Sequence, residues 1–110
     1  MELEVGKFEG YKTSKFGDLV CRDYFKTPKI ESGIVTVPPG GKGDIDPGHK
    51  DADEVFTVCS GTIIVIFPDM DKEVELKAGD AVLVPSDEPH IVENRTKEEA
   101  VFVYTGAPKL

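Results

Sequence analysis

The sequence predicts an all-β fold, a sandwich or barrel of short strands in one domain over residues 1–110. Valine and isoleucine dominate the apolar residues, and 11 glycines and 8 prolines interrupt them, which favours short strands joined by turns. No ten-residue segment shows a helical period of 3.6. A chain of 110 residues has room for one hydrophobic core, so a single domain is expected.

Eight short apolar segments are expected to form the strands. They are residues 19–25, 30–37, 54–59, 62–67, 73–76, 81–84, 90–93 and 100–104. Proline, glycine, serine and aspartate fill the breaks between most of them, as in turns. The segment 62–67 is apolar on both faces and predicts a strand covered on both sides, whereas 73–76 alternates charged and apolar residues like a half-exposed strand. Both patterns fit a closed or two-layered β structure.

The charge and hydropathy of the chain exclude several classes of protein. Asp and Glu number 21 against 13 Lys and Arg, a net charge of -8, so nucleic acid is not an expected partner. The mean hydropathy is -0.23 and no apolar run approaches the length of a membrane span, so no membrane partner is expected. The first ten residues do not resemble a secretion signal, and Cys21 and Cys59 lack a CxxC spacing. We therefore expect a soluble, cytoplasmic protein with reduced cysteines that act as small buried hydrophobes.

The two histidines of the chain point to a functional site. His49 lies in a polar loop over residues 38–53 that is rich in glycine and aspartate, and His90 follows a second turn that contains prolines. A loop of this length in so small a domain is usually functional or disordered. Both imidazoles are therefore expected at the entries of strands, next to rigid turns.

A carboxylate in a strand completes a possible metal site with these histidines. Two histidines and one carboxylate are the ligands that hold a divalent transition metal with open positions, and His49, His90 and Glu54 would supply them. Alternation places Glu54 on the same face as Phe56 and Val58, so its carboxylate points inward if they do. A buried carboxylate needs a metal, a cation or hydrogen bonds to compensate it.

The spacing of these residues resembles the first motif of the cupin superfamily. That motif runs Gly, five residues, His, one residue, His, three or four residues, Glu, six residues, Gly. Gly41, His49, Glu54 and Gly61 fit each spacing, and Pro47 stands where the first histidine is expected. The lead-in at residues 33–40 is also similar to that of cupins.

The second cupin motif follows in order further along the chain. It runs Gly, five residues, Pro, one residue, Gly, two residues, His, three residues, Asn. Gly79, Pro85, His90 and Asn94 match it, and Asp87 replaces the inner glycine. Aspartate tolerates the left-handed turn conformation better than most residues, so the replacement is mild.

The resemblance covers residues 38–104 and implies a double-stranded β-helix, a cupin-type jelly-roll barrel that is often dimeric, with its site in the barrel mouth. It assigns the metal to His49, Glu54 and His90, with Fe, Mn, Ni or Zn as the candidate ion. Pro47 cannot bind a metal, so one of the usual four protein ligands is missing. A small-molecule ligand and a homodimer are the partners that the family implies.

Two questions about the ligand set stay open at this stage. Asp46, Asp51 or Asp53 could supply a substitute oxygen ligand in place of the missing histidine. A register with the shorter spacing would put Lys50 in the second histidine position, but the register that uses His49 fits Gly41 and is preferred.

The sequence specifies the pocket around this site, and the function, less closely than it specifies the candidate ligands. Phe56, Val58 and Val92 share faces with the candidate ligands and are expected to form an apolar lining. Arg22 would either bind a carboxylate substrate or lie at the surface or in an interface. The first functional hypothesis is a small metal-binding protein acting on a low-mass metabolite such as a sugar or keto acid. The alternatives are a binding or sensing module without turnover and a purely structural dimerisation barrel.

Overall fold

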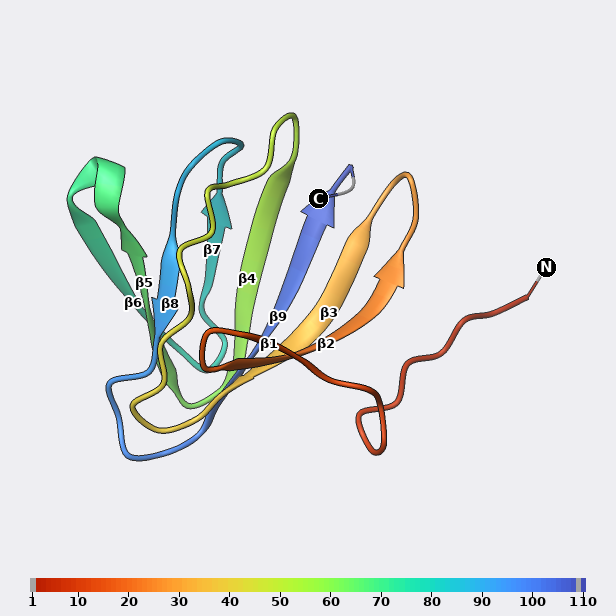
Figure 1. The fold of residues 1–110 in the computed structure, drawn as a ribbon, viewed down its shortest axis with the longest axis horizontal. Helices are drawn as coiled ribbons and strands as arrows, with labels where there is room; N and C mark the ends of the chain where they lie inside the picture. The colour runs from red at the N-terminus through yellow and green to blue at the C-terminus, as the bar shows by residue number, and fades with distance from the viewer. Residues whose placement is uncertain (1, 109) are drawn as a thin grey trace.

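The computed structural model describes residues 2–108 and 110 and confirms the all-β prediction (Figure 1). The strands in the described chain are β1 (Ser14–Phe16), β2 (Leu19–Lys26), β3 (Glu31–Val37), β4 (Asp53–Ser60), β5 (Thr62–Phe67), β6 (Lys72–Lys77), β7 (Ala81–Val84), β8 (Ile91–Glu93) and β9 (Ala100–Ala107). A single 3-10 turn, Pro68–Met70, joins β5 to β6. Eight of these strands correspond to the eight predicted segments. The sequence reading missed β1, whose three residues are all exposed and carry no apolar pattern.

The strands form two antiparallel sheets that enclose the core. One sheet has the order β1-β2-β3-β9-β4-β7 and the other the order β6-β5-β8. In Figure 1 the first sheet curves from β2 to β7, and the second lies beside the β7 end. Because β3 pairs with β9 and β9 with β4, residues distant in the sequence line one continuous inner face.

Alternation along the strands decides which side chains enter the core. On β3 and β9 every second residue is buried, and the same holds on β5 for Ile63, Val65 and Phe67. The other three residues of β5 are partly exposed, so the prediction that both faces of this strand are covered was too strong. The prediction for β6 is confirmed, because Leu76 is buried while its charged neighbours are exposed.

The long loop after β3 is ordered and runs beside β8. Single bridges join Lys42 to Glu93 and Asp46 to His90, so the loop extends the smaller sheet at the mouth of the barrel. His90 takes part in such a bridge and lies one residue before β8, although the predicted strand included it. The buried Asn94 amide donates hydrogen bonds to the carbonyls of Val37 (3.1 Å) and Glu98 (2.7 Å). The Asn94 backbone amide donates to the carbonyl of Gly41 (2.8 Å) and the Gly43 amide donates to that of Val92 (2.8 Å), which fixes the loop against the barrel.

Two further expectations concern the cysteines and membranes. Cys59 is exposed and Cys21 is partly buried, so the expectation that both are buried was wrong for Cys59, which lies at the end of β4 where the chain turns. Within residues 2–108 and 110, no helix has the length and apolar character that crossing a bilayer requires.

Candidate metal centre

Glu54 places a buried carboxylate at the mouth of the barrel. It is the second residue of β4 and pairs with Val84 on one side and Gly106 on the other. Its side chain is 7% exposed and, as alternation predicts, lies on the buried face with Phe56 and Val58. Its Oε1 atom is buried and has no hydrogen-bond partner. Such an atom is costly in an isolated protein, which points to a partner that binds there.

Asp46 and His90 are held together through their backbones. The amide of Asp46 donates to the carbonyl of His90 and the amide of His90 donates to the carbonyl of Asp46, both at 2.9 Å. The Oδ1 atom of Asp46 accepts a hydrogen bond from the Gly48 amide at 2.9 Å, while Oδ2 faces the imidazoles. The carboxylate is therefore oriented by its own turn before any ligand binds.

The tautomer of His90 follows from its hydrogen bond. Its Nδ1 lies 2.9 Å from the carbonyl oxygen of Glu88, which can only accept, so Nδ1 carries the proton. In the neutral ring Nε2 then has a free lone pair, and it faces the carboxylates of Asp46 and Glu54. The ring is 2% exposed and packs beside Phe56, with the ring centroids 5.6 Å apart. His90 is thus a fixed imidazole with its ligand atom directed into the site.

His49 comes from the tip of the loop and is 29% exposed at its side chain. Its carbonyl accepts a hydrogen bond from the amide of Asp87 at 3.1 Å, which joins the two turns that carry the histidines. Gly48 makes this approach possible, because a Cβ atom there would lie 2.5 Å from the Glu88 nitrogen and its φ is +92°. Asp87 has a φ of 59°, so aspartate does adopt the left-handed conformation at the position of the motif's glycine.

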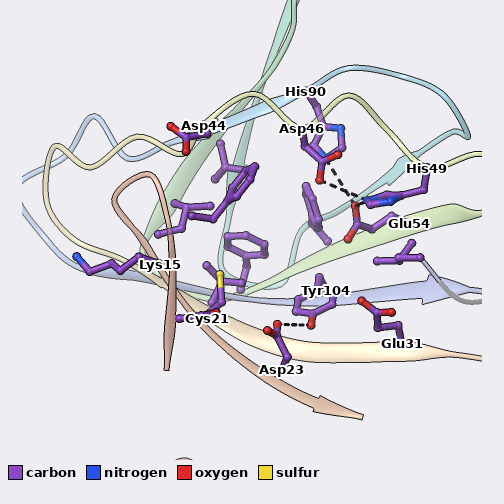
Figure 2. A pocket seen from close by; sticks show the side chains of 18 residues that line it. Lys15, Cys21, Asp23, Glu31, Asp44, Asp46, His49, Glu54, His90 and Tyr104 are labelled. Atoms are coloured by element: carbon purple, nitrogen blue, oxygen red, sulfur yellow. Dashed lines mark hydrogen bonds and ion pairs between the residues drawn. The ribbon is translucent and has the colours of Figure 1, made fainter. Parts of the chain in front are cut away.

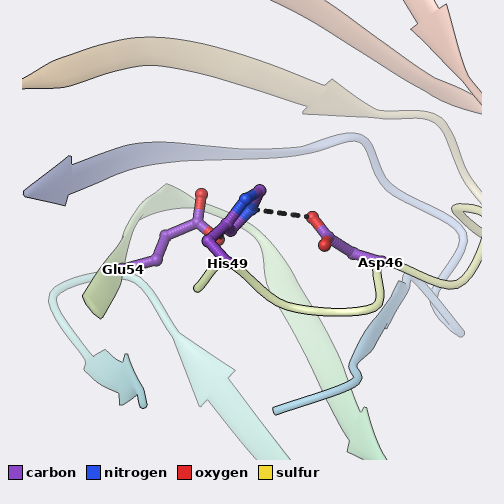
Figure 3. Close-up of side chains that lie close together, drawn as sticks. All are labelled: Asp46, His49 and Glu54. Atoms are coloured by element: carbon purple, nitrogen blue, oxygen red, sulfur yellow. Dashed lines mark ion pairs between the residues drawn. The ribbon is translucent and has the colours of Figure 1, made fainter. Parts of the chain in front are cut away.

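Each imidazole faces both carboxylates at the mouth of the barrel. Nε2 of His49 lies 3.4 Å from Asp46 Oδ2 and 3.8 Å from Glu54 Oε1, and Nε2 of His90 lies 3.6 Å from each of these oxygens. Figure 3 shows Asp46, His49 and Glu54, which could together hold a metal ion. Atoms bound to one ion at about 2.1 Å lie roughly 3.0–3.4 Å apart. The observed nitrogen–oxygen separations reach or slightly exceed this range. Among the described residues, the set whose donor atoms all lie within 4.8 Å of one another is Asp46, His49 and Glu54, and His90 is outside that set although its Nε2 faces both carboxylates.

The charges around His90 act on its protonation. Burial lowers the pKa of His90, but the interaction with Glu54, the Glu88 carbonyl and the negative charge of Asp46 together outweigh it and raise the pKa above its usual 6.5. These groups therefore favour the protonated form of the ring more than water does for a free imidazole. A cation placed among these groups satisfies the same two carboxylates.

The cluster lies in a cavity of about 330 Å³ inside the larger sheet (Figure 2). Its apolar lining includes Phe56 and Val92, as expected, together with Phe102, whereas Val58 is not among the lining residues. Arg22 does not line it either, because its guanidinium carbon lies 3.7 Å from the centre of the Phe8 ring on the outside of β2. The pocket role considered for this arginine is wrong, and its surface alternative is correct.

The structure also places the residues named in the two open questions about the ligands. Of the three candidate aspartates, Asp46 stands in the cluster, whereas Asp51 and Asp53 are exposed and do not line the cavity. Pro47 and Lys50 are exposed and lie outside the lining. The structure brings the three predicted side chains, His49, Glu54 and His90, together with Asp46; their role as metal ligands stays a prediction.

Two other polar residues of the cavity were not singled out from the sequence. Asp23 of β2 and Glu31 of β3 line the side opposite the cluster, where Tyr104 also points inward (Figure 2). A signal for Glu31 was available, since alternation from Val35 and Gly33 places it on the inner face. For Asp23 the signal was weaker, because the register of β2 against β3 shifts just after Arg22.

Comparisons with known proteins agree with this architecture. A family model described as "Cupin domain" matches residues 33–106. A conserved protein with a double-stranded β-helix domain from Klebsiella pneumoniae is similar in structure with a TM-score of 0.83 and 21% identity, covering 98% of this chain and 92% of that one. The cupin domain of Cnp3 from Schizosaccharomyces pombe gives a TM-score of 0.78 and 22% identity, over 94% of this chain and 72% of that one. KdgF from Halomonas gives a TM-score of 0.79 and 15% identity, over 100% of this chain and 96% of that one. No curated protein matches the sequence.

Proposed function

The chain belongs to the cupin domain family, and from this premise we propose that its barrel mouth is a mononuclear metal centre that acts on a low-mass metabolite. The proposed ligands are His49, Glu54 and His90, with Asp46 as the fourth. Asp46 would take the role of the histidine that the family motif expects beside it, at the position of Pro47. Two imidazoles and two carboxylates suit Fe, Mn, Ni or Zn.

The observation that carries this proposal is the unpartnered Oε1 of Glu54. The nearest nitrogens, on His49 and His90, lie 3.8 and 3.6 Å away, beyond hydrogen-bond distance, although the carboxylate is buried. The same oxygen faces a cavity of about 330 Å³, large enough for a small metabolite. A metal site explains both the lack of a partner and the orientation of the surrounding donors.

The protein's own residues would shape what happens at the centre. A bound divalent ion would supply Lewis-acid chemistry, polarising an oxygen of the ligand. Phe56, Phe102 and Val92 exclude water from the inner side of the cavity, since all three are buried. His49 is the most exposed of the four proposed ligands, so the open side of the centre lies toward it and the small molecule would enter there.

Binding without turnover is the second candidate function. Outside the four proposed ligands, Cys21 and Tyr104 are the thiol and the phenol of the described cavity. Burial, aided by the charge of Asp23, raises the pKa of Cys21 to about 11, and burial and the hydrogen bond to Asp23 raise that of Tyr104. Both groups stay protonated near neutral pH, so neither serves as a ready nucleophile or base. This favours a binding or sensing role if no reaction is found.

Elemental analysis tests the metal proposal directly. Protein purified without a histidine tag, and then supplemented with Fe, Mn, Ni or Zn, should retain about one ion per chain. His90→Ala should lose this ion, because it removes a fixed nitrogen donor, while the exposed Glu75→Gln should keep it. Stoichiometric metal in His90→Ala, or no metal in the wild type after supplementation, would contradict the proposed centre.

We also propose that the protein is a homodimer, as the family commonly is. β7 is an edge strand of the larger sheet and presents Leu83, which is 58% exposed. An exposed apolar residue on an open edge suits pairing with a second copy. Sedimentation that shows only the 12.0 kDa monomer at micromolar concentration would contradict this.

A further inference from the structure

The cavity carries negative charge on both of its sides. Besides Asp46 and Glu54 at the metal centre, the acidic residues Asp23, Glu31 and Asp44 line it. Among the described lining residues, Lys15 is the only lysine or arginine, and it is exposed. Five carboxylates against one ammonium leave an excess of negative charge even after a divalent ion is bound.

Asp23 and Glu31 place two carboxylates, hereafter the carboxylate pair, on the side of the cavity opposite the metal centre, one to each side of Tyr104 (Figure 2). The hydroxyl of Tyr104 donates a hydrogen bond to Asp23 Oδ1 at 2.5 Å. Because the phenol keeps its proton, Asp23 remains an acceptor with lone pairs to spare. Glu31 has 19% of its side chain exposed, and its Oε1 is buried without a hydrogen-bond partner. Both carboxylates can therefore accept further hydrogen bonds.

The basic groups near this pair are poorly placed to neutralise it. Lys26 Nζ lies 3.8 Å from Glu31 Oε1, but its side chain is 67% exposed, so the pair is weak. Lys12 shares a neighbouring depression with Asp23 and forms no ion pair in the described part of the chain. Arg22 is turned outward onto Phe8. An anionic ligand would thus meet repulsion here, while a cation would find unpaired acceptors.

The backbone is built to hold Tyr104 at this place. Its ring lies over Gly33 of β3, where a Cβ atom would come within 2.7 Å of the ring. The absence of a side chain at Gly33 lets the phenol reach Asp23 from β9 across β3. Tyr104 is therefore held at this place, and its hydrogen bond orients the carboxylate of Asp23, which is otherwise exposed.

We propose that the metabolite bound in this cavity is a small organic cation, an amine or guanidine. Its charged end lies at Asp23 and Glu31, and its other end carries an oxygen or nitrogen donor that reaches the metal centre. The inference rests on the proposed function for its second half, since the donor end needs the metal. The charged end depends only on the carboxylate pair.

Three hydroxamic acids that share one metal-binding end test the charged end. The probes are 6-aminohexanohydroxamic acid, hexanohydroxamic acid and adipic acid monohydroxamate, which end in an ammonium, a methyl and a carboxylate. Calorimetric titration of Zn(II)-loaded protein should show the ammonium probe binding about tenfold tighter than the methyl probe and the carboxylate probe weakest. Asp23→Asn and Glu31→Gln should each reduce the ammonium preference severalfold, and the matched control Glu75→Gln should not.

The possible failures of the two proposals can be told apart. Equal affinities, a preference for the carboxylate probe, or no binding of any probe to either Zn(II)-loaded or metal-free protein would overturn the organic-cation inference. An ammonium preference that survives in both Asp23→Asn and Glu31→Gln would also overturn it. Failure to retain Zn(II), with the ammonium preference intact in metal-free protein, would overturn the metal centre alone. Circular dichroism of each variant establishes that it is folded.

Discussion

Glu54→Gln should have opposite effects on the protein with and without metal. At a pH above the raised pKa of His90 that ring is neutral and offers no charge to the buried Glu54 carboxylate, whose Oε1 has no hydrogen-bond partner. Replacing the charge by a neutral amide should raise the free energy of unfolding of the metal-free protein by about 1–3 kcal/mol. At roughly 4 °C per kcal/mol for a domain of this size, the gain in melting temperature is readily measured.

With metal present the order should reverse. The wild type gains about 2.7 kcal/mol when the free ion is at about 100 times its dissociation constant, and the variant, which lacks the ligand, gains little. Urea unfolding of both proteins, with chelator and with Zn(II), measures the four free energies. Glu75→Gln, an exposed site with the same chemical change, should match the wild type in both conditions. The reasoning would be refuted if metal-free Glu54→Gln were less stable than the metal-free wild type. It would also be refuted if Zn(II) raised the free energy of unfolding of the variant as much as that of the wild type.

Three further predictions concern the residues around the centre. Asp46→Asn should weaken metal binding at least about tenfold, because the Oδ2 atom of Asp46 faces both imidazoles. Pro47→His should change the metal affinity little, because residue 47 is exposed and lies outside the cavity lining. Metal titration of the two variants compares these effects. The pKa of His90 is raised above 6.5, so metal affinity should fall as the pH drops through this raised pKa. In the metal-free protein, the stability that His90 contributes should be fully present below about 6.5 and be lost as the pH rises through the raised pKa. Metal titrations and urea unfolding across this range measure both, and no pH dependence of either would contradict the assignment. Gly48→Ala should cost about 1–3 kcal/mol in urea unfolding, because its φ is +92° and a Cβ would lie 2.5 Å from the Glu88 nitrogen; an unchanged midpoint would show that the two turns are not held together there.

The strands could be predicted wherever alternation and turn residues agreed. The segments 62–67 and 81–84 match β5 and β7 residue for residue, because apolar alternation ends at proline or glycine on at least one side. β9 extends beyond the predicted 100–104 to Ala107, since Gly106 pairs with both Glu31 and Glu54 although glycine is a poor strand former. Pairing with neighbouring strands decided that boundary, and a single sequence does not contain it.

The candidate site was predictable to the extent that spacing specifies it. Motif spacing indicated His49, Glu54 and His90, and the structure brings their side chains together. The sequence could not choose among the three nearby aspartates, because the choice depends on the backbone bridge that joins Asp46 to His90 across the barrel mouth. Asp23, on the opposite side of the cavity, was missed for a similar reason: its partner, Tyr104, is 81 residues away in the chain.

The bridge between Asp46 and His90 also has a consequence for folding kinetics. Glu54 belongs to the larger sheet, whereas Asp46 and His90 lie on the extension of the smaller one, so an ion bound by all three would cross-link the two sheets. The four donors meet only after strands distant in the sequence have closed around the core, which places the complete site late in folding. A bound ion would then stabilise the native state without stabilising the transition state, and it would lengthen the lifetime of the folded protein by slowing unfolding while leaving the folding rate almost unchanged.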